Sequence, residues 1–362
     1  MHPPPNTLIR ILVVDDSSLA RKLLSLLINE DPRFIVVSAA ADGREAISLM
    51  PVLKPDLILM DINMPRMDGF EATKWIMAHQ PTPILIVTSS LYRDGVNQTL
   101  KALSYGALDV FEKNQIEVPA VEETVKAELL ERMYTLARVP VLTHPVGKLT
   151  PPAPPADQVA RLSGGWLVAI AGSTGGPQAL LKILKTFPKN TPLTFLVVQH
   201  ISPGFSAGLA EWLDHECQLT VTQAASGMRQ EPATVYIAPA GAQTRIADDR
   251  TIRVSDAPAA PKRAPSADVL FESIAKVYGP RAIGIILSGM GKDGAAGLKT
   301  LKDAGGVVLA QDEATSVIFG MAKAAVDAGA VDFVLPVDRI PDTILHIAGR
   351  LSEAADRPRP PA

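Results

Sequence analysis

The chain has one cysteine among its 362 residues, Cys217, so it forms no internal disulfide and offers no cysteine metal cluster. No apolar run reaches the roughly 20 residues that a membrane-spanning helix requires. The opening MHPPPNT lacks the basic and apolar regions of a signal peptide. A net charge of −3 gives no sign of a general nucleic-acid surface. We therefore expect a cytoplasmic protein without membrane insertion and without a nucleic-acid partner.

Hydrophobic residues are plentiful, at 47%, and the length suits two globular domains. Between them lies VPVLTHPVGKLTPPAPPADQVARLSGG, whose prolines sustain neither helix nor sheet and predict a semi-extended linker. The expected segments are an N-terminal tail at 1–7, a first domain at 8–125, a helix and proline-rich linker at 126–163, a second domain at 164–352 and a disordered tail at 353–362.

Both domains alternate apolar runs with helical patterns. The first domain opens with LIRILVVDD, a continuous apolar run that suits a strand buried on both faces, followed by leucines at helical spacing. Five such strands alternating with five helices predict a doubly wound parallel α/β sheet, and the second domain repeats the pattern. Within the second domain, residues 219–256 show period-2 patterns and turn residues, which predict an inserted β-hairpin.

Polar side chains mark the carboxyl ends of the strands in the first domain, where ligands of open α/β sheets bind. Asp15 and Asp16 follow the first strand, Asp61 follows the third, and Thr88 and Lys113 end the fourth and fifth. Crowded carboxylates repel unless a cation neutralises them, and Mg²⁺ prefers such oxygen ligands. The set predicts a site that stabilises a phosphoryl group on Asp61; the alternative is that these residues are helix caps and solvated strand ends.

This constellation, with DINMPRMDG after the third strand, resembles the receiver domains of two-component response regulators over about residues 8–125. The resemblance implies that Asp61 accepts phosphate from a histidine kinase and that Thr88 and Lys113 sense the phosphoryl group. The implied Mg²⁺ ligands are Asp16, Asp61, the Asn63 carbonyl and, assisting, Asp15. Two positions depart from the family: Asn114 stands where proline is usual, and Val110 where an aromatic switch residue is common.

In the second domain, the stretch AIAGSTGGPQAL joins an apolar run to a helical pattern through a glycine-rich turn. It matches neither a P-loop nor a dinucleotide fingerprint. Pro177 suits the first helical turn, so the helix start is an anion site. Ser173 stands at the strand–helix junction, as a nucleophile on an elbow does, although this stretch alone favours the alternative of a tight structural turn.

A nucleophilic serine needs a base and an orienting carboxylate. His200 ends the apolar strand FLVVQ, at the sheet edge that carries Ser173. Asp293 lies at the same edge, in the loop of IILSGMGKDGAAGL. His200 could instead be a capping or core residue, and Asp293 the N-cap of a helix beginning near Gly294. The other histidines fall in segments expected to be flexible or helical: His2, His79, His144, His215 and His346.

GSTGGP, QH and LSGMGKDGAAGL, with PSADVLFESIA and QDEATSVIFGMAKAA, resemble the catalytic domain of chemotaxis protein-glutamate methylesterases over about 164–350. The receiver–linker–esterase order extends the resemblance over nearly the whole chain. It implies a triad of Ser173, His200 and Asp293, with oxyanion stabilisation by backbone groups of Thr174 and Met290. The family usually reads Gly-Ala where Ala171 and Gly172 stand here.

The implied activity is hydrolysis of γ-glutamyl methyl esters on chemoreceptors, without a cofactor for the esterase reaction, together with deamidation of receptor glutamines. The unphosphorylated receiver is expected to dock over the Ser173 edge, and phosphorylation of Asp61 to loosen it. One alternative is a response regulator whose second domain is catalytically silent and only binds a partner. A DNA-binding response regulator is disfavoured because the second domain lacks a basic recognition helix.

Overall fold

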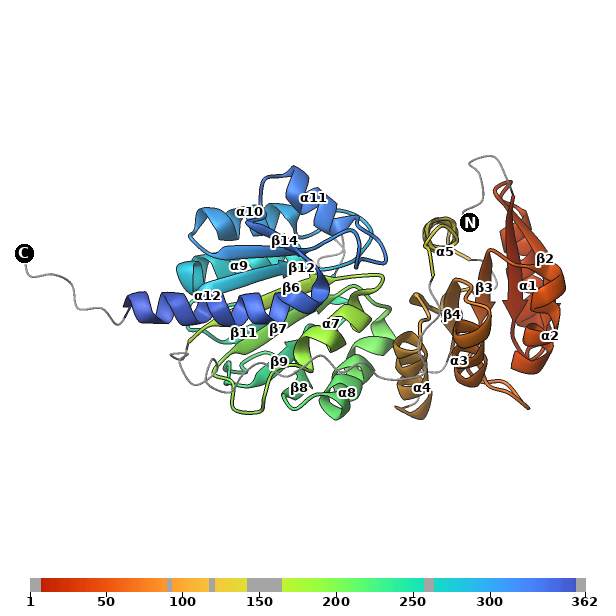
Figure 1. The fold of residues 1–362 in the computed structure, drawn as a ribbon, viewed down its shortest axis with the longest axis horizontal. Coiled ribbons are helices and arrows are strands. Elements are labelled where there is room, and N and C mark those ends of the chain that lie inside the picture. Colours follow the sequence, from red (N-terminus) through yellow and green to blue (C-terminus); the bar gives the residue numbers. More distant parts are fainter. Residues whose placement is uncertain (1–7, 90–92, 117–120, 142–164, 257–263, 356–362) are drawn as a thin grey trace, which may run out of the picture. The chain divides into compact units, whose positions relative to one another are not determined.

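The computed structural model describes residues 8–89, 93–116, 121–141, 165–256 and 264–355. The chain divides into two compact units, Met1–Leu149 and Thr150–Ala362, and each contains a parallel sheet flanked by helices (Figure 1). The expected N-terminal tail and most of the proline-rich linker lie outside the described residues. The last helix, α12 (Ile340–Ala355), continues three residues into the expected C-terminal tail.

The first unit has a five-stranded parallel sheet in the order β2-β1-β3-β4-β5. Its strands are β1 (Ile9–Val14), β2 (Phe34–Ala40), β3 (Leu57–Met60), β4 (Ile84–Thr88) and β5 (Asp109–Glu112). Its helices are α1 (Ser18–Asn29), α2 (Gly43–Leu53), α3 (Gly69–His79), α4 (Arg93–Ser104) and α5 (Glu123–Leu136). This confirms the predicted alternation, and the continuous apolar runs are strands buried on both faces, as β3 and β4 show.

The helices of this unit begin where the sequence supplies capping side chains. Ser17, Asp42 and Asp68 each accept a hydrogen bond from the first turn of α1, α2 and α3, respectively. Helix α5 contacts β5 of the same unit, where Arg132 donates to the Asp109 carboxylate and to the Val110 carbonyl.

The second unit has a seven-stranded parallel sheet in the order β14-β13-β12-β6-β7-β9-β8. Its strands are β6 (Leu167–Gly172), β7 (Thr194–Gln199), β8 (Thr220–Gln223), β9 (Thr234–Ile237), β12 (Ala282–Ile286), β13 (Val307–Gln311) and β14 (Phe333–Leu335). Its other helices are α7 (Gly176–Leu184), α8 (Ser206–Glu216), α9 (Ala267–Tyr278), α10 (Ala295–Asp303) and α11 (Met321–Asp327). Helices α9, α10 and α11 share one buried cluster with the sheet, whereas α12 packs with α7 on the other face (Figure 1).

The predicted β-hairpin at 219–256 is only half right. The strands β10 (Ala242–Ile246) and β11 (Ile252–Asp256) form an antiparallel pair. The two preceding segments, β8 and β9, instead extend the main sheet in parallel. An alternating pattern marks any half-buried strand, so it did not distinguish a strand at the edge of the parallel sheet from a hairpin arm.

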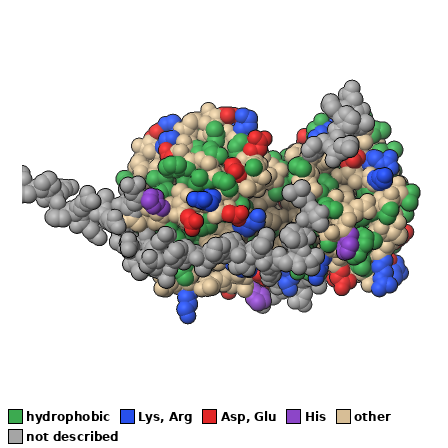
Figure 2. Space-filling view, in the orientation of Figure 1, with side chains coloured by type: hydrophobic (Ala, Val, Ile, Leu, Met, Phe, Trp, Pro, Cys, Tyr) green, Lys and Arg blue, Asp and Glu red, His purple; other side chains and the backbone are tan. Residues whose placement is uncertain are grey.

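Within the described residues, no helix combines the length and the apolar character needed to cross a bilayer. Acidic and basic side chains are interspersed on the face drawn in Figure 2, in keeping with the net charge of −3.

In both sheets the later strands are added on the opposite side of the first strand. This places a topological switch point between β1 and β3 in one unit and between β6 and β12 in the other. Ligands of open α/β sheets bind at the carboxyl ends of the strands beside such a point.

Candidate active site and phosphoacceptor site

Ser173 lies in the turn between β6 and α7, beside the switch point of the second sheet. The turn is closed by a hydrogen bond from the Gly176 N–H to the Ser173 carbonyl, and Gly175 adopts a φ of 78° at the start of the helix. The Ser173 N–H donates to the carbonyl of Ser288, which follows β12, at 3.0 Å. These contacts hold the serine backbone between two strand ends, with the residue 5% exposed.

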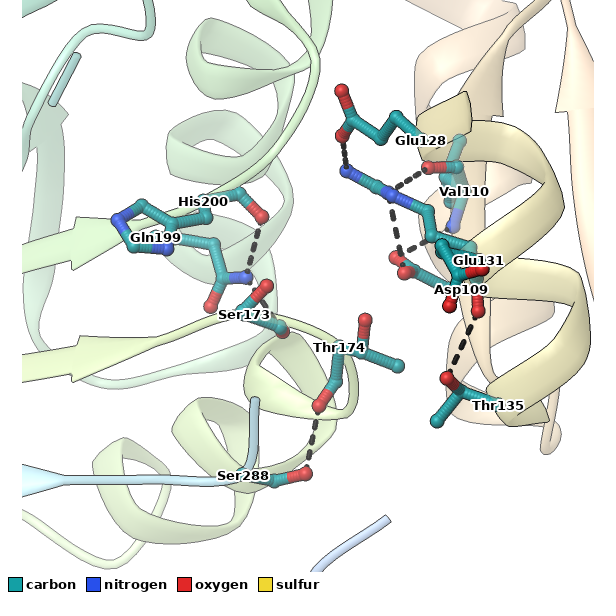
Figure 3. Close-up of polar contacts among 11 residues, drawn as sticks. Asp109, Val110, Glu128, Glu131, Thr135, Ser173, Thr174, Gln199, His200 and Ser288 are labelled. Carbon is teal, nitrogen blue, oxygen red and sulfur yellow. Dashed lines mark hydrogen bonds and ion pairs between the residues drawn. The ribbon is translucent and has the colours of Figure 1, made fainter. Parts of the chain in front are cut away.

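Gln199, the last residue of β7, ties the serine turn to His200. Its amide nitrogen donates to the carbonyls of Ser173, at 2.8 Å, and of His200, at 3.1 Å (Figure 3). The N–H of His200 donates in turn to the carbonyl of Gly172. Sequence reasoning missed this role, although a glutamine closing an apolar strand just before a candidate base was an available signal.

His200 and Asp293 meet as predicted: the imidazole Nε2 lies 2.9 Å from the Asp293 carboxylate. Because a carboxylate only accepts hydrogen bonds, Nε2 carries the proton of this contact. The other ring nitrogen, Nδ1, is buried and has no hydrogen-bond partner among the described residues. Among the described residues, no hydrogen bond joins the Ser173 hydroxyl to His200. Such contacts are often long in ligand-free structures and tighten when substrate binds.

Asp293 is fixed by the start of α9, so the alternative that it caps its own helix is wrong. Its Oδ1 accepts from the Ser266 hydroxyl and the Asp268 N–H, and its Oδ2 from the Ala267 N–H. Burial acts to raise the pKa of Asp293, but the hydrogen bonds from His200 and Ala267 outweigh it and hold that pKa well below its usual range. The Asp293 carboxylate is therefore ionised at every pH at which a histidine is neutral and can act as a base.

The two residues predicted to stabilise an oxyanion lie on either side of the switch point. Thr174 is buried, and its carbonyl accepts from the Ser288 hydroxyl at 2.7 Å (Figure 3). Met290 follows Gly289, whose backbone pairs with the segment at Phe319. A Cβ on Gly289 would lie 2.7 Å from the Ser173 Cβ, so the two turns approach as closely as glycine permits.

Cys217 is no competing nucleophile. Burial raises the pKa of its thiol to about 12, so almost none of the reactive thiolate is present near neutral pH.

In the first unit the acidic residues gather at the predicted sheet edge. Carboxylate oxygens of Asp15, Asp16 and Asp61 lie within 4.8 Å of one another. The Lys113 ammonium contacts Asp15 at 2.6 Å and Asp61 at 3.1 Å. Burial raises the pKa of Asp15, and the Asp61 charge adds to that effect. Burial acts to lower the pKa of Lys113, but the contacts with Asp15 and Asp61 together outweigh it and raise that pKa. Three carboxylates against one ammonium suit a divalent cation with oxygen ligands.

The remaining predicted residues of this site surround the acids. Thr88 is fully buried at the end of β4, and Asn63 is exposed in the loop after β3. Gly69, at the end of that loop, packs against the Asp61 backbone. A Cβ at this position would lie 2.0 Å from the Asp61 carbonyl oxygen. Val110, at the position where the family often has an aromatic residue, is buried within β5, and Asn114, at the usual proline position, is exposed. Sequence reasoning missed Arg21, whose guanidinium donates to the carbonyls of Asp15 and Asp16.

Clustered carboxylates with a lysine on one α/β sheet, and a serine, histidine and aspartate at the strand ends of another, are the arrangement expected of a two-domain response regulator with a hydrolase-type output domain. Comparison with known families agrees: residues 11–124 match the response regulator receiver domain and residues 168–344 match the CheB methylesterase. A protein-glutamate methylesterase/protein-glutamine glutaminase from Anaeromyxobacter dehalogenans is 44% identical over 340 residues, covering 94% of this chain and 97% of that protein. Its namesake from Pyrococcus abyssi is 38% identical, covering 93% of each chain.

Among solved structures, the Thermotoga maritima CheB methylesterase catalytic domain is 37% identical to this chain. It covers 51% of this chain and 100% of its own, with a TM-score of 0.49. The chain belongs to the protein-glutamate methylesterase/protein-glutamine glutaminase family.

Proposed function

We propose that this protein is a phosphorylation-regulated serine esterase that hydrolyses γ-glutamyl methyl esters on chemoreceptors. The observation that carries the proposal is the 2.9 Å contact between His200 Nε2 and an immobilised Asp293, at the sheet edge where Ser173 stands. The names of relatives that match over nearly their whole length support the substrate class.

In the acylation step, the Ser173 hydroxyl oxygen attacks the ester carbonyl and its proton passes to His200. Because Asp293 occupies Nε2, the nitrogen that receives the proton is Nδ1. Asp293 keeps the ring in this tautomer and stabilises the imidazolium that forms. His200 then returns the proton to the departing methoxide, and methanol leaves an acyl-serine.

Deacylation repeats the same proton transfers with water. His200 Nδ1 takes a proton from water, the hydroxyl adds to the acyl carbon, and the proton returns to the Ser173 oxygen as the receptor glutamate is released. The same sequence on a receptor glutamine releases ammonia instead of methanol. We therefore assign deamidation to the same three side chains.

The oxyanion of each tetrahedral intermediate is assigned to backbone N–H groups of Thr174 and Met290. Thr174 precedes the start of α7, where N–H groups and the helix dipole favour negative charge. The hydrogen bond from Ser288 to the Thr174 carbonyl holds this peptide against the β12 turn that carries Met290. Loss of one such donor typically costs about 2.7–4 kcal/mol of transition-state stabilisation.

For the receiver, we infer that Asp61 accepts a phosphoryl group from a histidine kinase. Asp15, Asp16, Asp61 and the Asn63 carbonyl fit Mg²⁺, which supplies charge neutralisation to the phosphoryl oxygens when bound. Lys113, already within 3.1 Å of the Asp61 carboxylate, is placed to contact those oxygens. Thr88 ends the adjacent strand and is assigned to sensing the same group.

The partners that follow are the methylated cytoplasmic part of a chemoreceptor, as substrate, and a histidine kinase, as phosphodonor. Both place the reaction in the cytoplasm. The alternative of a catalytically silent output domain lacks support, because the relatives carry enzyme names and Asp293 has the contacts of an orienting carboxylate.

The test is methanol release from methylated receptor membranes, measured with and without a small phosphodonor. We expect activity that the phosphodonor increases, no activity in Ser173→Ala, and basal but unresponsive activity in Asp61→Ala. Full activity of Ser173→Ala would refute the esterase mechanism. An Asp61→Ala protein that still responds would refute regulation through this aspartate.

A further inference from the structure

Within the described residues, the carboxylate of Asp293 receives four hydrogen bonds, and three of them come from one short segment. Ser266 Oγ and the Asp268 N–H donate to Oδ1, while the Ala267 N–H donates to Oδ2 beside His200 Nε2. An ionised carboxylate offers about four lone-pair sites, so this group is saturated. Its orientation toward His200 is therefore set by the segment that begins α9.

Among these contacts, the Ser266 hydroxyl is the one supplied by a side chain other than the histidine. Ser266 is buried and is the N-cap of α9, where its oxygen also accepts from the Val269 N–H. Its own N–H donates to Gln243, which is buried as well. The Ser266 oxygen thus accepts a hydrogen bond from the helix, while the hydroxyl hydrogen donates to Asp293 Oδ1.

A second set of hydrogen bonds joins α9 to α10, the helix that follows Asp293, and here the acceptor belongs to α9. Asp268 Oδ1 accepts from the N–H groups of Gly294, at 3.0 Å, and Gly297, at 2.7 Å, at the start of α10. A Cβ on Gly297 would lie 2.6 Å from the Asp268 carbonyl oxygen, so the helices approach closely. The backbone that carries Asp293 is thus fixed by α9, independently of the contact that fixes its carboxylate.

We propose that Ser266 is a positioning residue for ester hydrolysis, because its hydroxyl holds the Asp293 carboxylate in the orientation that receives the His200 Nε2–H. This rests on the proposed function, since it assumes that Ser173, His200 and Asp293 perform the reaction. Ser266 touches neither substrate nor reacting atoms. Its effect is therefore confined to the chemical steps and depends on the presence of Asp293.

The test compares initial rates of methanol release by the full chain, with phosphodonor present, over a range of methylated receptor concentrations. Ser266→Ala removes the hydroxyl, and Ser266→Gly removes it while keeping a residue that is tolerated at an N-cap. We expect kcat to fall about tenfold in both with KM within about twofold, as for one lost hydrogen bond to a charged group. Ser266→Thr, which keeps the hydroxyl, should restore kcat.

Two controls separate positioning from stability. Ser273→Ala also removes a hydroxyl from α9, one that donates to the Leu270 carbonyl and accepts from the Ile246 N–H, but it does not touch Asp293. It should lower the melting temperature and leave kcat unchanged. In an Asp293→Ala background, removing the Ser266 hydroxyl should cause no further loss of kcat, because the carboxylate it orients is absent.

Equal losses in the wild-type and Asp293→Ala backgrounds would overturn the proposal, and so would a kcat of Ser266→Gly within about twofold of wild type. The esterase assignment fails separately: it falls if wild type releases no methanol or if Ser173→Ala remains active. An active wild type, an inactive Ser173→Ala and an unaffected Ser266→Gly would refute only the role of Ser266.

Discussion

Gly289→Ala should disable the esterase by moving its nucleophile. A Cβ at this position would lie 2.7 Å from the Ser173 Cβ and 3.0 Å from the Ser173 N–H nitrogen. Carbon atoms in favourable contact are about 3.5–4.0 Å apart, so the two turns must separate by about 1 Å. A displacement of that size at a reacting group can cost about 100-fold in rate. We therefore expect kcat to fall by about two orders of magnitude.

The same Cβ would lie 2.4 Å from the Met321 sulfur, and that flexible side chain must also shift. Overpacking of this kind typically costs about 1–3 kcal/mol of unfolding free energy. The assay combines methanol release, covalent labelling of Ser173 by a serine-directed probe, and urea unfolding. Gly329→Ala serves as the control, because its positive φ of 65° penalises alanine while, apart from its chain neighbours, no atom of the described residues lies within 4 Å of the new Cβ.

Wild-type kcat and labelling in Gly289→Ala would refute the reasoning, because the close approach of the two turns would then be irrelevant to the nucleophile. A loss of kcat in Gly329→Ala equal to that in Gly289→Ala would also refute it. Lost stability, rather than a displaced serine, would then explain both.

Three further changes test other contacts. Gln199→Leu removes the donor to the Ser173 and His200 carbonyls and should lower the unfolding free energy in urea by about 2–4 kcal/mol; an unchanged midpoint would contradict this. Lys113→Met removes the ammonium that contacts Asp15 and Asp61, so added Mg²⁺ should raise the melting temperature of this variant more than that of wild type. An equal or smaller rise would count against a cation site. Because the folded-state pKa of Asp293 lies below the ordinary 3.8, its stabilisation is complete above that pH and is lost as the pH falls toward the folded value. Wild type should therefore lose more unfolding free energy below pH 3.8 than Asp293→Asn, and parallel curves would refute the assignment.

The sequence predicted the two parallel sheets and the strand-end location of both sites because those features are local. A buried parallel strand is a continuous apolar run, and the residue that follows it lies at the sheet edge, as Ser173, His200 and Asp61 do. The error at β8 and β9 has the opposite origin. These two strands pair with each other, but in parallel, and β9 also pairs with β7. Whether an alternating segment pairs in parallel or antiparallel depends on tertiary packing, which the alternation does not encode.

The partners of Asp293 were likewise beyond prediction from local pattern. Its donors Ser266 and Ala267 precede it by 27 and 26 residues and belong to a different helix. An aspartate before a glycine at a helix start predicts a cap for its own helix, yet Asp293 binds the start of α9 while Asp268 binds the start of α10. Only the close approach of the two helices, permitted by Gly297, makes this exchange possible.

The two sites balance their negative charge in different ways, and the difference matches their chemistry. In the receiver domain three carboxylates lie together and one ammonium contacts two of them, so oxygen lone pairs remain for a cation. In the second domain the Asp293 carboxylate accepts from three donors at the start of α9 and from His200. In the mechanism proposed above, the charge that Asp293 would meet is the one that appears on His200 when it takes the Ser173 proton.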